Sequence, residues 1–175
     1  SILNNENGLT HIKFDQNITK LCESIGHVPI PPYLNRADHE TDRERYQTVF
    51  ANHRFTDSAA APTASLHFDD ELFDSVNKNF TTCKISLAVG LGTFKPLSDE
   101  PITESSTLHD EDFFISDESA KLINNQIKND KRVIAIGTTT LRALEAAWCN
   151  KLNLIKPGKN TTNIFIKEGY KFKVV

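Results

Sequence analysis

Residues 137–142, Gly-Thr-Thr-Thr-Leu-Arg, have the types and order of an anion-binding helix start. An apolar run at 132–136 precedes them and predicts a buried parallel strand, and the residues behind them predict a helix. Free backbone N–H groups, threonine hydroxyls and the Arg142 guanidinium would converge at a sheet edge, where a carboxylate or phosphate binds well. The spacing fits equally well a threonine that only caps the helix while Arg142 pairs with Glu145 or solvent.

Gly90 and Gly92 lie in a Gly-Leu-Gly-Thr-Phe turn that follows a predicted strand. Glycine lets a ligand approach the backbone closely. The turn is not a complete dinucleotide-binding fingerprint, and Pro96 prevents a helix from opening directly behind it. Turn geometry alone is the commoner cause of such a pattern, and ligand binding stays the alternative.

Two histidines are candidates for proton transfer. His109 is followed by Asp-Glu-Asp at 110–112, so an imidazole–carboxylate cluster is one interpretation and an acidic loop in water is the other. His67 is flanked by apolar residues, and such a histidine is more often buried and hydrogen-bonded than catalytic. No histidine stands at metal-ligand spacing from a cysteine or another histidine, so we expect no metal.

In the N-terminal half we expect short elements joined by a stiff loop. A strand at 8–14 precedes a helix that starts at Asn17 and ends at Gly26 in a left-handed cap. Three prolines make 27–34 an extended loop. Further helices are predicted behind a capping box of Thr41 with Glu44, which leads a helix through Phe50, and behind Asp69.

The C-terminal half predicts an α/β fold with a mixed or parallel sheet and flanking helices. Its helices are expected to start at Ser116 or Asp117 and directly after Gly137. The strands are expected at 83–89, 132–136, 163–166 and 170–175. Residues 132–166 would then form a βαβ unit.

Composition is that of an ordinary globular protein, with 38% apolar and 25% charged residues in 175. No apolar run reaches membrane-spanning length, and no secretory signal begins the chain. Three widely spaced cysteines favour a reducing compartment, so we expect the cytoplasm. Net charge is −3, but residues 151–175 carry six lysines against one glutamate, which suits either a phosphate backbone or a solvated edge.

Six motifs follow one another in the order found in one enzyme family. They are Gly-His-Val-Pro-Ile-Pro-Pro-Tyr at 26–33, Asp-Arg-Glu-Arg-Tyr-Gln-Thr-Val at 42–49, Ala-Ala-Pro-Thr-Ala-Ser-Leu-His-Phe at 60–68, Val-Gly-Leu-Gly-Thr-Phe at 89–94, Val-Ile-Ala-Ile-Gly-Thr-Thr-Thr-Leu-Arg-Ala-Leu-Glu at 133–145, and Ile-Phe-Ile at 164–166 followed by Gly-Tyr-Lys-Phe-Lys-Val-Val at 169–175. With this set the chain resembles the S-adenosylmethionine:tRNA ribosyltransferase-isomerases of queuosine synthesis.

The resemblance covers about half of such an enzyme, which pairs an α/β domain with a separate β-barrel. It implies that residues 1–16 are the end of a mostly absent barrel, and that 17–175 are the catalytic α/β domain, incomplete at its C-terminus. The chain also lacks methionine and begins and ends within predicted strands. We therefore expect either an excerpt of a longer protein or a sequence from which residues were lost.

Several residues depart from the family pattern. Ala88 stands where the family has a histidine, which removes an acid/base or ligand contact. Ser65 replaces a glycine before Leu-His-Phe, Leu108 replaces a methionine, and Glu168 replaces a proline.

The activity that the resemblance implies is transfer and isomerisation of the ribosyl group of S-adenosylmethionine. The acceptor would be 7-aminomethyl-7-deazaguanine at the tRNA wobble position, and the product epoxyqueuosine, with adenine and methionine released. S-adenosylmethionine is then a co-substrate, tRNA is the macromolecular partner, and neither a metal nor a membrane is involved. We expect a monomer.

The resemblance also implies roles for named residues. The proton-transfer candidates are His67, His109 and Glu111. The residues expected to line S-adenosylmethionine or hold its carboxylate or a tRNA phosphate are Gly90, Gly92, Thr93, Gly137, Thr138, Thr139 and Arg142. The residues expected to face tRNA are Arg36, Arg45, Tyr46, Gln47 and Thr63.

Two other classes of function stay open at this stage. One is a catalytically inactive α/β module that binds a nucleotide or anion, which Ala88 favours. The other is a scaffold without a ligand. Release of adenine in a tRNA-dependent way would exclude the first, and saturable thermal stabilisation by S-adenosylmethionine would exclude the second.

Overall fold

The computed structural model describes residues 1–6, 9–52, 58–94, 103 and 106–175, and of Leu9, Leu91 and Phe94 only the backbone. Gly8 of the predicted first strand and Pro96 behind the glycine turn lie outside these residues. The fold mixes helices and sheets, and every strand pair is antiparallel in the described part of the chain.

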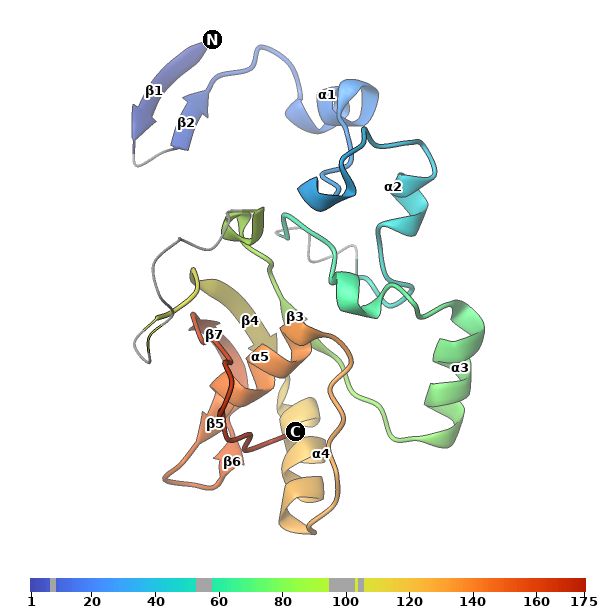
Figure 1. The fold of residues 1–175 in the computed structure, drawn as a ribbon, viewed down its shortest axis with the longest axis vertical. Coiled ribbons are helices and arrows are strands. Elements are labelled where there is room, and N and C mark those ends of the chain that lie inside the picture. The colour runs from blue at the N-terminus through green and yellow to red at the C-terminus, as the bar shows by residue number, and fades with distance from the viewer. Residues whose placement is uncertain (7–8, 53–57, 95–102, 104–105) are drawn as a thin grey trace.

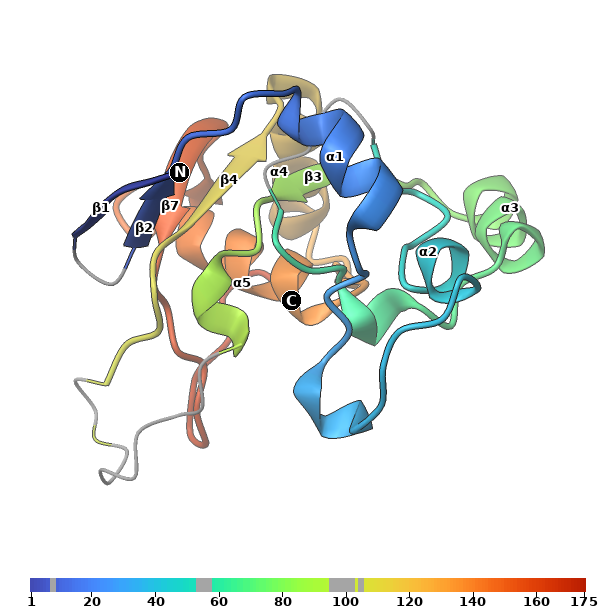
Figure 2. The same ribbon diagram turned by 90° about the horizontal axis from the view of Figure 1, so that it is seen from above.

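The central sheet has three strands in the order β3-β4-β7 (Figures 1 and 2). These are β3 (Ile85–Leu87), β4 (Glu111–Ile115) and β7 (Gly158–Thr162). Helices α4 (Asp117–Lys128) and α5 (Thr138–Ala147) and a small pair, β5 (Trp148–Cys149) with β6 (Leu154–Ile155), complete this half.

The hydrophobic core lies between this sheet and the two helices. Its buried members come from β4, α4, α5, β6 and the C-terminal segment: Phe113, Ile115, Ala120, Ile123, Ala143, Leu144, Ala147, Ile155 and Val174. Side chains of β4 alternate between buried and exposed, as a strand with one face on a core requires. Glu111 falls in phase with Phe113 and Ile115, so this carboxylate is the polar end of the apolar face.

The predicted parallel strand at 132–136 is wrong. Val133 and Ala135 pack against the core, but Ile134 is 74% exposed and the segment joins no sheet. A continuous apolar run predicts burial on both faces, whereas this segment packs by one face only. The βαβ unit and the parallel sheet are therefore also wrong, because β4 pairs antiparallel with both of its neighbours.

The predicted strands at 163–166 and 170–175 are wrong as well. The strand of this region is β7, which ends at Thr162, and the chain beyond it is irregular. Glu145 on α5 holds that irregular segment by accepting hydrogen bonds from the backbone N–H groups of Lys173 (2.9 Å), Val174 (2.9 Å) and Val175 (3.2 Å). Side-chain acceptors thus replace a neighbouring strand as partner of this backbone.

The N-terminal half begins with a hairpin of β1 (Ile2–Glu6) and β2 (Leu9–Ile12), of which only the second strand was predicted. The hairpin lies at the opposite end of the view from α4 (Figure 1). Helix α1 (Ile18–Ile25) begins as predicted, with the Asn17 side chain accepting from Lys20 N–H. Gly26 behind it is extended, not left-handed, so that predicted cap is wrong.

The remaining helices of this half are short. They are the 3-10 helix η1 (Pro32–Leu34), α2 (Asp42–Arg45), the 3-10 helix η2 (Thr63–Ser65), α3 (Asp70–Asn79) and the 3-10 helix η3 (Leu91–Phe94). Asp69 caps α3 as predicted. Thr41 makes no side-chain cap, so the capping box is wrong, and α2 ends at Arg45 rather than at Phe50. Among the described residues, no helix has both the length and the apolar character needed to cross a membrane.

Candidate functional site

Glu111, the first residue of β4, lies at the centre of a buried polar cluster. Its side chain is 1% exposed. One carboxylate oxygen, Oε2, accepts a hydrogen bond from Nη1 of Arg142. The other, Oε1, lies 3.2 Å from Nε2 of His109 and 3.3 Å from the N–H of Gly90. A buried carboxylate with these partners has its charge balanced in place, which fixes the groups around it.

Arg142 reaches this carboxylate from the second turn of α5. Its Nε donates to the carbonyl of Ile164 at 3.2 Å, and its side chain is 14% exposed. The remaining nitrogen, Nη2, is buried and has no hydrogen-bond partner in the described part of the chain. The alternative in which Arg142 pairs with Glu145 is wrong, because Glu145 is occupied by the C-terminal backbone and by the hydroxyl of Tyr170 at 3.2 Å.

His109 packs directly on the glycine turn. A Cβ added at Gly92 would lie 2.3 Å from Cγ of His109, and one added at Gly90 would lie 3.2 Å from Cδ2. The imidazole therefore occupies the space that side chains at these two positions would fill. Its side chain is 31% exposed, and its Nε2 contacts Glu111.

The start of α5 faces a second buried polar group. Gly137 is the N-cap residue and has φ +94°, a left-handed conformation that side chains rarely adopt. A Cβ at Gly137 would lie 2.5 Å from Oγ of Ser65 and 3.8 Å from Oγ1 of Thr139. The helix has no side-chain cap and no acidic residue in its first turn. The prediction that a threonine only caps this helix is therefore wrong.

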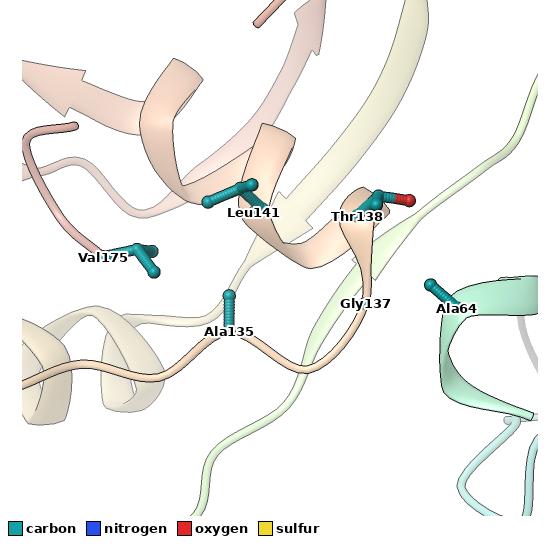
Figure 3. Close-up of a pocket in the computed structure, with 6 residues that line it drawn as sticks. All are labelled: Ala64, Ala135, Gly137, Thr138, Leu141 and Val175. Carbon is teal, nitrogen blue, oxygen red and sulfur yellow. The ribbon is translucent and has the colours of Figure 1, made fainter. Parts of the chain in front are cut away.

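A cavity of about 260 Å³ opens beside this helix start (Figure 3). Its lining is almost entirely apolar and comes from η2, the segment before α5, α5 itself and the chain end: Ala64, Ala135, Gly137, Thr138, Leu141 and Val175. In Figure 3 Leu141 and Val175 point into the same space from two elements, and the Thr138 hydroxyl points away from them.

The proline-rich loop is shaped by two aspartates. Asp42 accepts two hydrogen bonds from Arg36, at 2.6 and 2.9 Å, and one from the backbone N–H of His39. The Arg36 guanidinium, with that N–H, holds the pKa of Asp42 well below its usual range. Asp38 likewise accepts from the N–H of Val28, which with the nearby His27 lowers the pKa of its carboxyl.

Several predicted residues lie outside the Glu111 cluster. His67 is exposed next to the Phe68 ring, so the expectation that it is buried is wrong. Thr93 is exposed on η3. Arg36 is committed to Asp42. The remaining residues predicted to face tRNA are exposed or half-buried: Arg45, Tyr46, Gln47 and Thr63. Burial raises the pKa of Tyr46.

The cluster has the parts of an acid–base site: a partly exposed imidazole, a carboxylate that orients it and a guanidinium that fixes the carboxylate. No group of three or more potential metal ligands occurs among the described residues.

The sequence spacing predicted that His109 lies with Glu111, and it treated Arg142 separately. It missed the buried Ser65 hydroxyl, for which the replacement of the family's glycine was the available signal.

Comparison with known proteins gives matches to queuosine biosynthesis proteins. The sequence model described as queuosine biosynthesis protein matches residues 1–175. Three curated relatives carry the name S-adenosylmethionine:tRNA ribosyltransferase-isomerase. The protein of Treponema denticola is 44% identical over 94% of this chain and 47% of its own length. That of Caldanaerobacter subterraneus is 42% identical over 93% and 46%, and that of Francisella tularensis subsp. novicida is 45% identical over 95% and 48%.

The chain spans about half the length of the curated relatives it matches. The family match covers all 175 residues, and a relative is 44% identical over 94% of this chain. This chain belongs to the queuosine biosynthesis protein family.

Proposed function

We propose that this protein transfers and isomerises the ribosyl group of S-adenosylmethionine onto 7-aminomethyl-7-deazaguanine at the tRNA wobble position, giving epoxyqueuosine. The names of the relatives support both the co-substrate and the tRNA. The observation that carries the proposal is the connected series His109, Glu111 and Arg142, because the reaction needs a positioned proton acceptor in a site that excludes water.

His109 is the general base in this proposal. When its Nε2–H donates to Glu111, the lone pair of Nδ1 is left to take up a proton from C5′, which the neighbouring sulfonium acidifies. The imidazolium that results lies beside the Glu111 carboxylate, which stabilises it. Glu111 already accepts from Arg142 and Gly90, so it acts as a positioning residue together with Arg142.

The co-substrate is proposed to bind across the glycine turn and the start of α5. The His109 imidazole fills the space next to Gly90 and Gly92, and Thr93 is exposed beside them. At the helix start, Gly137 and Thr138 line the cavity, the Thr139 hydroxyl lies near Gly137, and the first backbone N–H groups of α5 have no partner within the helix.

The tRNA is proposed to lie over the exposed residues Arg45, Gln47 and Thr63 and the half-buried Tyr46. Arg36 contributes indirectly, by holding the loop through Asp42. We place the protein in the cytoplasm as a monomer, with residues 1–16 belonging to a second domain. In support, the described part of the β1–β2 hairpin pairs only with itself.

The test is release of adenine from S-adenosylmethionine, measured with and without tRNA that carries the acceptor base. We expect release only with that tRNA, and at least a 100-fold lower kcat for His109→Gln, because a positioned general base contributes about 10²–10⁴-fold. His11→Gln, an exposed histidine on β2, is the matched control and should turn over normally. His67→Ala tests the other proposed histidine.

Two outcomes would count against the proposal. If the wild type binds S-adenosylmethionine but releases no adenine with tRNA, the chain belongs to a binding module. If His109→Gln retains normal turnover while His67→Ala loses it, the base is His67 and the role given to the Glu111 cluster is wrong.

A further inference from the structure

We propose that the Ser65 hydroxyl and the N-terminus of α5 together bind an anionic group, which we assign to the carboxylate at the methionine end of S-adenosylmethionine. The carboxylate assignment rests on the proposed function; the anion site does not. The family resemblance implies a glycine at this position, so the role proposed for Ser65 is specific to this chain.

The first observation is the state of Ser65. It is 1% exposed, and its Oγ has no hydrogen-bond partner in the described part of the chain. A buried hydroxyl without a hydrogen-bond partner costs free energy, so we expect a bound ligand to form a hydrogen bond with it. The hydroxyl is aimed at the N-cap of α5, because a Cβ at Gly137 would lie 2.5 Å from Oγ.

The second observation is the helix start itself. The first N–H groups of a helix have no partner within the helix, and here Gly137 supplies no side-chain cap. The first turn contains no acidic residue, and α5 runs for ten residues, so its dipole favours a negative charge at this end. The Thr139 hydroxyl borders the same point.

The neighbourhood decides which anion suits the site. Two nitrogens of Arg142 are already held, by Glu111 and by the carbonyl of Ile164, so the contacts proposed here come from neutral hydroxyl and backbone N–H donors. The adjoining cavity is lined by Ala135, Leu141 and Val175, which suits a short aliphatic chain (Figure 3). The methionine end of S-adenosylmethionine, a carboxylate linked through the amine-bearing carbon to two methylene groups, can use both the donors and the apolar lining, whereas a bare phosphate needs no apolar neighbour.

The experiment measures binding to the full protein by titration calorimetry with three probes: S-adenosylmethionine, its decarboxylated analogue and inorganic phosphate. Binding of acceptor tRNA is measured beside them. The variant is Ser65→Ala, and Ser119→Ala is the matched control. Ser119 is also buried, but its hydroxyl already donates to the carbonyl of Lys84 at 2.9 Å, away from this site.

We expect Ser65→Ala to bind S-adenosylmethionine about tenfold more weakly, since a hydrogen bond to a charged group is lost, and to bind the decarboxylated analogue as the wild type does. The melting temperature of the ligand-free variant should not fall, because an unpartnered hydroxyl is removed. Ser119→Ala should show the reverse, with lower stability and unchanged affinity.

Other outcomes identify the source of the anion or overturn the site. Weaker binding of tRNA and inorganic phosphate with unchanged S-adenosylmethionine affinity supports the anion site but assigns it to a tRNA phosphate. If S-adenosylmethionine does not bind the wild type at all, the proposed function fails, while a loss of phosphate binding in Ser65→Ala still supports the site. Wild-type affinity of Ser65→Ala for all four ligands overturns it.

Discussion

The guanidinium of Arg142 lies against the carboxylate of Glu111, 31 residues earlier in the chain, and both side chains are largely enclosed. The contact joins α5 to the first residue of β4, so it fixes the helix to the sheet at the point where His109 and the glycine turn also meet. One buried ion pair thus organises the candidate active site.

Breaking this pair should destabilise the fold. We expect Glu111→Gln to lower the free energy of unfolding by about 3 kcal/mol, because the Arg142 charge stays buried without its counter-ion. Arg142→Met should cost a similar amount, and the double variant less than the sum. Urea unfolding measures all three. Asp112→Asn is the control: its pair with Lys159 is exposed, so we expect a much smaller loss of stability. Strictly additive losses in the double variant would contradict the coupling.

The glycine turn makes a separate prediction about turnover. Gly92→Ala places a methyl group 2.3 Å from Cγ of His109, so the ring must leave its place beside Glu111. We expect adenine release to fall about 100-fold, since small displacements of a catalytic group cost that much. Gly90→Ala brings a methyl group only to 3.2 Å from Cδ2, and a fall of a few fold is expected. Equal effects of the two variants would show that the imidazole is not held by the turn.

The ion pair of Asp42 with Arg36 should make the stability of the fold depend on pH. Its pKa is lower in the folded protein because of Arg36, so its contribution is present above the unfolded pKa of about 3.9 and is lost as the pH falls further. We expect Asp42→Asn to be less stable than the wild type at pH 7, with the difference shrinking below about pH 4. Urea unfolding between pH 7 and pH 3 checks this. A difference that stays constant over that range would exclude the ion pair as its cause.

Helix starts were predictable from sequence because an N-cap acts over three residues. Asn17, Asp69 and Ser116 each accept from a backbone N–H three positions ahead, and the three helices begin where these residues predict. Thr41 carries the same pattern but fails, because the next residue, Asp42, is drawn into the pair with Arg36. A tertiary contact overrode the local signal.

Strands and the site were less predictable because both depend on partners distant in the chain. The run at 132–136 has the composition of a strand but no neighbour pairs with it. Conversely, Asn160 and Thr161 are polar and form part of β7, because β4 lies alongside. Sequence spacing placed His109 next to Glu111, but only the packing of α5 on the sheet brings Arg142 to the same carboxylate.

Tyr170 should report the state of the C-terminal segment at alkaline pH. Burial, together with the nearby Glu145 carboxylate, raises its pKa to about 12. Because the folded value lies above the ordinary value of about 10, the stability that Tyr170 contributes is complete below pH 10 and is lost as the pH rises through 12. Titration at 295 nm should show one tyrosine ionising near pH 12 that is absent in Tyr170→Phe. In Glu145→Gln that step should move down, because the negative charge is gone. If Tyr170→Phe instead removes a step near pH 10, Tyr170 is not held against Glu145, and the segment that lines the cavity through Val175 is not fixed there.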